Sequence, residues 1–191
     1  DGEVLVDGIN VQNYKFDTLY DKLGYVTQKA VLFAGSIREN VFFGESAAPE
    51  TDEELKNAIE LSQAEEFVDK LPDGTEHMIS QMGRNVSGGQ KQRLSIARAL
   101  SRKPEILVFD DSFSALDYKT DAKLREGLNE KLKDTTKIIV AQRISTIRHA
   151  DKIIVLDRGE AVGMGTHEEL MKNCDVYKEI ALSQLSAAEL A

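Results

Sequence analysis

Two adjacent aspartates, Asp110 and Asp111, stand directly after the apolar run Ile106–Phe109. A continuous apolar run is typical of a strand buried on both faces of a parallel sheet. A carboxylate at the carboxyl end of such a strand points into the crevice where open α/β sheets bind ligands, and in phosphate-processing proteins it holds Mg²⁺ directly or through water. Apolar strands also end in Asp for turn chemistry alone, so this pair leaves both interpretations open.

The segment Ser87-Gly88-Gly89 is a sharper candidate, because a helix is expected to begin there. The first N–H groups of a helix have no partner within it, which makes a helix start a ready anion site. The glycines let the backbone approach a ligand closely, and Ser87 offers a hydroxyl. An ordinary helix cap would explain these three residues alone. It does not explain why an Asp-Asp strand end and then Ser114-Ala115-Leu116-Asp117 follow at short distance.

The elements that must position these residues alternate between strands and helices. Strands are predicted at 3–8, 23–27, 105–110, 137–141 and 152–156, the last three as apolar runs buried on both faces. Helical spacing of apolar residues predicts helices over 51–71, 89–102 and 123–132, and Thr166 with Glu169 caps another. This alternation predicts an α/β fold, a mostly parallel sheet with flanking helices, plus a small helical subdomain.

Four segments, in order, resemble the motifs of ABC (ATP-binding cassette) transporter nucleotide-binding domains. Val86–Gln90 resembles the signature motif, Ile106–Asp110 the Walker B strand, and Ser114–Asp117 the D-loop, while Gln28 resembles the Q-loop glutamine. Two further stretches, 32–41 and 141–153, resemble the exporter type of this family. The resemblance implies an incomplete P-loop ATPase core that hydrolyses ATP with Mg²⁺ to drive transport.

The resemblance also implies roles for single residues. Asp110 and Gln28 would bind Mg²⁺, and Gln28 would also sense the γ-phosphate and face the transmembrane domain. Family members dimerise head to tail, so each ATP lies between one subunit's Walker motifs and the other's signature. The remaining nucleotide-site residues expected here are Ser87, Gly88, Gly89, Gln90 and Asp117. The implied partners are a second nucleotide-binding domain and a transmembrane domain, at the cytoplasmic face of the cell membrane.

The sequence departs from the family at four places, one of which is Gln81, where the loop before the signature usually has Glu. No Gly-x-x-x-x-Gly-Lys-(Ser/Thr) occurs, so we expect an N-terminal part with the phosphate loop to be missing and residues 1–191 alone to be inactive. Asp111 stands where active members have the catalytic Glu, and Gln142 where they have the switch His. These changes favour the degenerate-site half of a heterodimeric exporter. The alternatives are a regulatory or structural ATP-dependent clamp without transport, and a fully active homodimeric exporter ATPase.

Length and composition bound the rest. The 191 residues carry a net charge of −9, which argues against a nucleic-acid partner because such binding needs clustered Lys and Arg. No apolar run approaches the roughly 20 residues that cross a bilayer, and Cys174, the one cysteine, can form no internal disulfide. We expect one domain in three segments: core strands and Q-loop at 1–46, a helical subdomain at 47–95, and further core at 96–191.

Overall fold

The computed structural model describes residues 2–185. The chain divides after Val140 into two compact units, 1–140 and 141–191, which we describe separately. The predicted division of the chain at residues 47 and 96 stays a prediction.

The first unit is built on a three-stranded parallel sheet of order β3-β6-β7. Its strands are β3 (Leu23–Val26), β6 (Ile106–Asp110) and β7 (Thr136–Val140). The central strand β6 pairs with both neighbours, so the carboxyl ends of all three strands lie at one edge. Gly24 allows close packing, because a Cβ there would lie 2.7 Å from Leu107 Cδ2 and 2.8 Å from Pro104 Cγ. The predicted mostly parallel sheet is confirmed.

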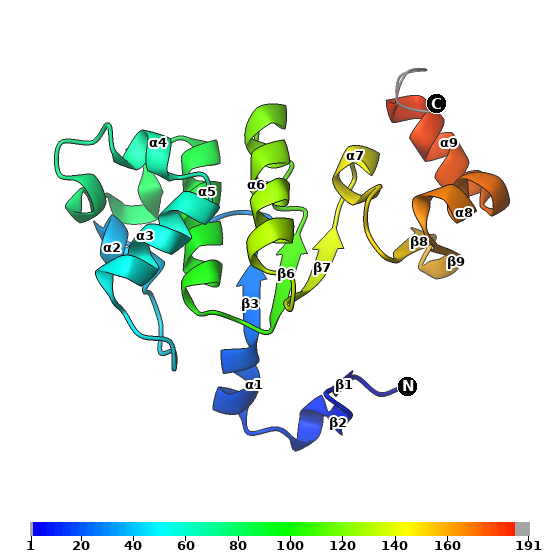
Figure 1. The fold of residues 1–191 in the computed structure, drawn as a ribbon, viewed down its shortest axis with the longest axis horizontal. Coiled ribbons are helices and arrows are strands. Elements are labelled where there is room, and N and C mark those ends of the chain that lie inside the picture. The colour runs from blue at the N-terminus through cyan, green and yellow to red at the C-terminus, as the bar shows by residue number, and fades with distance from the viewer. Residues whose placement is uncertain (1, 186–191) are drawn as a thin grey trace. The chain divides into compact units, whose positions relative to one another are not determined.

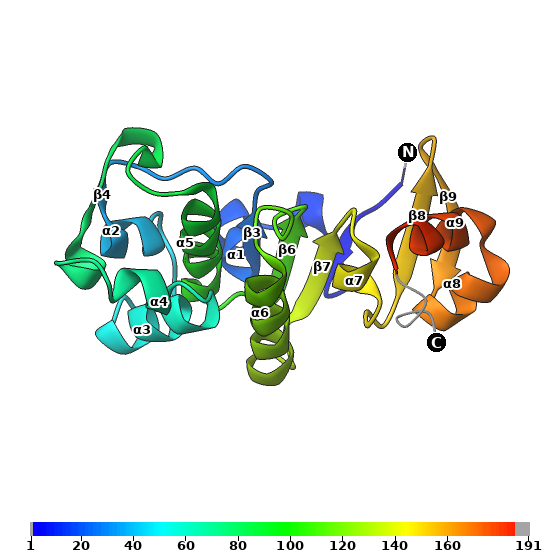
Figure 2. The same ribbon diagram turned by 90° about the horizontal axis from the view of Figure 1, so that it is seen from above.

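Helix α5 (Gly88–Ser101) packs on β3 and is the centre of the helical part. Figures 1 and 2 show α2 (Ile37–Val41), α3 (Asp52–Leu61) and α4 (Glu65–Val68) gathered on the side of α5 away from the strands. The other helices of this unit are α1 (Phe16–Lys22) and α6 (Tyr118–Lys131). Fully buried apolar side chains join sheet and helices into one core, among them Val26, Leu94, Ile96, Leu107, Phe109 and Leu124.

Short elements complete the first unit. They are β1 (Leu5–Val6) with β2 (Ile9–Asn10), β4 (Gly35–Ser36) with β5 (Met78–Ile79), and three 3-10 turns, η1 (Val11–Asn13), η2 (Gly74–Glu76) and η3 (Gln81–Gly83). Both strand pairs are antiparallel.

Two helices differ from the predicted ones. The segment 51–71 forms two helices, because the chain leaves the helix at Gln63, whose φ of 60° lies in the left-handed region. Helix α6 begins at Tyr118 and not at residue 123, because the Asp117 side chain accepts hydrogen bonds from the N–H groups of Lys119 and Thr120. The cap therefore starts this helix before its apolar periodicity becomes visible.

The second unit is a hairpin covered by helices. Strands β8 (Ile153–Asp157) and β9 (Glu160–Gly165) pair antiparallel, and α8 (His167–Asn173) and α9 (Asp175–Gln184) pack on them, after the short helix α7 (Ile144–Ile147). The predicted capping box of Thr166 and Glu169 is confirmed at the start of α8. The core of this unit includes Val155, Leu170 and the fully buried Tyr177.

The prediction that the 137–141 and 152–156 strands are buried on both faces is wrong. In β7, Ile138 and Val140 are 51% and 52% exposed, and in β8 the side chains of Ile154 and Leu156 also face solvent. The reason is tertiary: an apolar run is buried on both faces only where other elements cover both, and alternate apolar side chains of β7 and of β8 stay exposed. In the same residues, no helix is long and apolar enough to cross a membrane.

Candidate functional site

The aspartate pair lies at the carboxyl edge of the sheet, where β6 ends. Asp111 N–H donates to Val140 O at 2.9 Å, which continues the β6–β7 pairing by one residue. Its φ of 43° is left-handed, a conformation that Asp tolerates better than most residues. The Ser114 hydroxyl donates to Asp111 O at 2.7 Å and fixes the turn that follows. The chain therefore reverses at the place where the two carboxylates stand.

The structure brings Gln28 and Asp111 together. Gln28 Nε2 donates to Asp111 Oδ2 at 3.1 Å, across strands β3 and β6, which are parallel neighbours. The turn around Gln28 is closed by the Thr27 hydroxyl, which donates to Lys29 O at 2.8 Å. A carboxamide and two carboxylates thus meet at one edge, although 82 residues separate Gln28 from Asp110 in the chain.

Asp110 has a partner that the sequence analysis missed. Tyr25 OH donates to Asp110 Oδ2 at 3.0 Å, and this hydrogen bond, more than burial, raises the pKa of the Tyr25 hydroxyl. The available signal was position: Tyr25 stands three residues before Gln28 on the strand next to β6. Two further polar residues on α5, Gln92 and Arg98, were also missed, and both contact the segment that follows β3.

The signature segment forms the start of α5. Ser87 Oγ accepts from Gln90 N–H at 3.3 Å, and Gln90 Oε1 accepts from Ser87 N–H at 2.8 Å, which is a complete capping box. A Cβ on Gly88 would meet nothing within 4 Å, and one on Gly89 would lie an ordinary 3.5 Å from Ala115 O. The fold does not need glycine at position 88. Open space over an exposed helix start is what an approaching anion requires.

The other two predicted site residues, Asp117 and Gln142, make hydrogen bonds that stabilise their own surroundings. Asp117 caps α6, and the Thr120 backbone N–H, followed by the Thr120 hydroxyl, lowers the pKa of its carboxyl. Gln142 belongs to the second unit, where its carbonyl accepts from Gln184 Nε2 at 2.8 Å. Gln184 Oε1 accepts in turn from Ile144 N–H at 2.9 Å, so α9 holds this segment.

The donor atoms at the sheet edge fit Mg²⁺. Asp110 offers carboxylate oxygens, and Gln28 uses its amide nitrogen on Asp111, so its amide oxygen is the atom suited to a cation. Residues 2–185 contain no group of three or more His, Cys, Asp or Glu side chains placed to hold a metal ion. Proteins commonly hold Mg²⁺ through one or two carboxylates together with waters and substrate phosphates.

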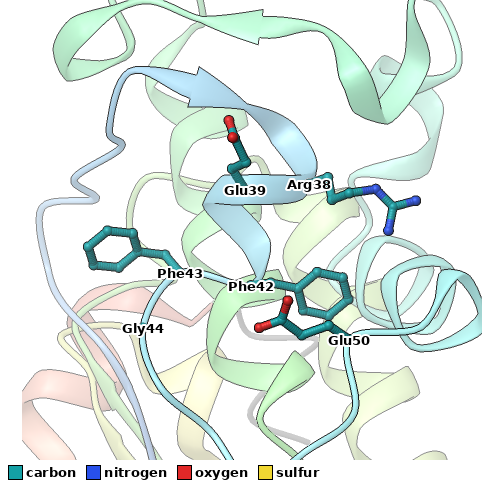
Figure 3. Close-up of a pocket in the computed structure, with 6 residues that line it drawn as sticks. All are labelled: Arg38, Glu39, Phe42, Phe43, Gly44 and Glu50. Carbon is teal, nitrogen blue, oxygen red and sulfur yellow. The ribbon is translucent and has the colours of Figure 1, made fainter.

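A pocket of about 420 Å³ lies elsewhere, on the segment after Gln28 (Figure 3). Its lining consists of Arg38, Glu39, Phe42, Phe43, Gly44 and Glu50. Phe43 stacks on Phe33 with ring centroids 4.0 Å apart, and both rings are more than 40% exposed. None of the predicted nucleotide-site residues lines this pocket, so it is a second surface feature and not the phosphate site.

Comparison with known proteins places the chain. The family model described as ABC transporter matches residues 1–114. The chain belongs to the ABC transporter family. It is 44% identical to an ABC transporter ATP-binding protein of Mycoplasma genitalium over 96% of this chain and 31% of that protein. It is 40% identical to a protein of Staphylococcus aureus named as a multidrug export ATP-binding/permease protein, over 94% of this chain and 31% of that protein.

A solved structure agrees with this assignment. The structure of a bacterial Atm1-family ABC exporter with ATP bound matches with a TM-score of 0.89 and 33% identity, over 96% of this chain and 32% of that chain. The α/β fold with a parallel sheet and covering helices is therefore that of an ABC transporter's nucleotide-binding domain. The chain spans about a third of the length of the relatives it matches.

Proposed function

We propose that this chain is the ATP-binding part of an ABC exporter subunit, an ATPase that powers export by closing against a second nucleotide-binding domain. The observation that carries the proposal is the contact of Gln28 with Asp111 beside Asp110 at the carboxyl edge of the sheet. An exporter is favoured because the multidrug export relative and the Atm1-family exporter match nearly the whole chain. The proposed location is the cytoplasmic face of the cell membrane.

In this proposal Asp110 and Gln28 hold Mg²⁺, which when bound neutralises charge on the phosphates of ATP. Gln28 also holds the Asp111 carboxylate through the 3.1 Å hydrogen bond, and Asp111 orients the attacking water. Asp is one methylene shorter than Glu, so its carboxylate is withdrawn by about 1.3 Å. A displacement of about 1 Å costs on the order of 10²-fold in rate.

The catalytic positions and the signature of this chain then belong to two different nucleotide sites. Its own site is slow, because Asp111 is short and because Gln142 cannot carry the positive charge that His adopts. The open helix start at Ser87, Gly88 and Gly89 binds the γ-phosphate of ATP held by the partner, and Gln90 fixes its geometry. Asp117, in the D-loop, lies at the same interface. The complex is a heterodimer with one degenerate site.

An ABC exporter subunit also needs a phosphate loop and a transmembrane domain. The 191 residues contain no Gly-x-x-x-x-Gly-Lys-(Ser/Thr) loop, and the relatives are about three times longer. We propose that the phosphate loop and the transmembrane domain lie in the remaining sequence. Phe43, which lines the pocket of Figure 3, and Phe33, which stacks on Phe43, are exposed and offer an apolar surface for the transmembrane domain.

The test restores the two altered residues. The full-length protein is assembled with its partner, and the partner's own catalytic carboxylate is replaced to lower background turnover. Asp111→Glu together with Gln142→His is expected to raise ATP hydrolysis above background by more than the sum of the single changes, because the two side chains act as a unit. Turnover that stays at background with the double change would remove Asp111 and Gln142 as the cause of a slow site.

A further inference from the structure

Gln92 is a polar side chain in the core of the first unit. It is 1% exposed, on the inner face of α5, among buried apolar neighbours on the same helix such as Leu94 and Ile96. Burying a carboxamide is costly unless it is hydrogen-bonded. Its Nε2 donates to Thr27 O at 3.1 Å, a contact 65 residues away in the chain. This contact satisfies one of the two amide N–H groups, and it joins α5 to the residue directly before Gln28.

The hold on Thr27 matters because Gln28 itself is exposed. An exposed glutamine has many rotamers, and ordering it in one geometry costs conformational entropy. Here the backbone before Gln28 is held by Gln92, and the turn after it is closed by the bond from the Thr27 hydroxyl to Lys29 O. With the backbone held on both sides, the Gln28 side chain stays within reach of Asp111.

A second residue of α5 fastens the far end of the same segment. Arg98 Nη1 donates to Val31 O at 2.9 Å, and its Nε donates to Asn40 O at 2.7 Å. Burial lowers the pKa of Arg98 to about 10, and its guanidinium lies 5.4 Å from the centroid of the Phe33 ring. The stretch from Thr27 to Asn40 is thus attached to α5 at both ends, through Gln92 and Arg98.

The position of Gln92 on α5 connects this attachment to the signature. Gln92 stands four residues after Gly88, which is one helical turn, on the same face of the helix. A displacement of α5 at Ser87 and Gly88 therefore reaches Thr27 through the Gln92 hydrogen bond, beside the packing of α5 on β3 and the bond from Arg98 to Val31 O.

We propose that Gln92 is a positioning residue for Gln28. It holds Gln28 where it can bind Mg²⁺ and Asp111, and it carries movement of the signature, which binds the partner's ATP, to this chain's own nucleotide site. This inference rests on the proposed function, which assigns Gln28 and the signature to those two sites.

The experiment measures Mg²⁺ dependence of nucleotide binding at this chain alone. The full-length protein, assembled with its partner, is photolabelled on ice with 8-azido-ATP over a range of Mg²⁺ concentrations, and the label on this subunit is quantified after gel separation. Gln92→Met keeps the volume but removes the donor. It is expected to raise the half-saturating Mg²⁺ concentration by about tenfold, as loss of a residue that orients a metal ligand does.

The matched control is Ile96→Val, another change at a fully buried position of α5, which is expected to leave the Mg²⁺ dependence unchanged. Gln92→Met added to Gln28→Ala is expected to give no shift beyond that of Gln28→Ala, because Gln92 acts through Gln28. If Gln92→Met prevents the folded protein from accumulating in cells, Gln92→Asn replaces it. Asn keeps the amide, but its side chain is one methylene too short to reach Thr27.

The outcomes distinguish a failure of the positioning role of Gln92 from a failure of the proposed function. A shift with Gln28→Ala but none with Gln92→Met overturns the inference and leaves the proposed function standing. No shift with Gln28→Ala removes Gln28 from the metal site, which overturns that part of the proposed function and the inference with it. Equal shifts with Gln92→Met and Ile96→Val would show a general loss of packing, and would also overturn the positioning role.

Discussion

Replacing Gly88 by alanine separates what the fold needs from what a ligand needs. Gly88 is the first residue of α5, and a Cβ there would meet nothing within 4 Å. Alanine reduces the freedom of the unfolded chain, so Gly88→Ala is expected to leave stability unchanged or raise it by up to about 1 kcal/mol. The same Cβ would occupy the space through which a phosphate oxygen must come within about 3 Å of the helix N–H groups.

The expected functional cost is therefore large. Displacing the bound phosphate by about 1 Å would lower ATP turnover of the assembled transporter on the order of 10²-fold. Thermal unfolding and ATP hydrolysis are measured on the same preparation of full-length protein. The control is Gly24→Ala, where the new Cβ would lie 2.7 Å from Leu107 Cδ2 and 3.1 Å from Ala99 O, and where overpacking is expected to cost roughly 1–3 kcal/mol.

Two results would refute the reasoning about Gly88. If Gly88→Ala lowers the melting temperature as much as Gly24→Ala does, the fold needs the glycine. If Gly88→Ala leaves turnover unchanged, no phosphate approaches this helix start, and the signature does not act in a competent site.

Three further outcomes are expected. Residues 1–191 alone should show no measurable ATPase activity and at best very weak ATP affinity, because they lack the phosphate loop; micromolar nucleotide binding by calorimetry would contradict this. If the proposed heterodimer is correct, Ser87→Arg should lower its turnover at least tenfold more than Asp111→Asn, because the signature would then serve the faster site; equal losses would contradict the asymmetry. Burial is the main cause of the lowered pKa of His167, whose Nδ1 lies 2.8 Å from Tyr177 OH. The unfolded chain therefore binds the proton more readily, so the second unit should lose stability as pH falls from about 6.5 towards the lower folded pKa, and His167→Gln should abolish this dependence in urea unfolding.

The parallel sheet and the starts of α3, α5 and α8 were predictable because their signals are local. The apolar run before Asp110 and the capping residues Thr51 and Thr166 each act within a few positions, and each lies where the sequence indicates. The break at Gln63 was not predictable from periodicity, because the apolar spacing continues across it to Phe67. A left-handed residue between two short helices leaves the pattern of apolar residues intact.

Burial and side-chain contacts were harder to predict because they depend on distant parts of the chain. An apolar run indicates two buried faces only if other elements cover both, and Ile138 and Val140 in β7 are about half exposed. Gln92 and Arg98 interrupt the apolar pattern of α5, which is a visible signal. What they bind could not be inferred, since it depends on which loop passes over the helix.

The start of helix α5 and its later turns have different roles. Its start is exposed at Ser87 and Gly88, and Ser87 and Gln90 each accept a hydrogen bond from the other's backbone N–H there. Its second and later turns are bound to the Gln28 segment through Gln92 and Arg98. A ligand that displaces the first turn of α5 can therefore also displace the Gln28 segment through these two side chains, without unfolding a helix or strand. If, as proposed, the signature serves the partner's site while Asp111 leaves this chain's own site slow, nucleotide bound at the own site would also influence the signature, since coupling between two sites is reciprocal.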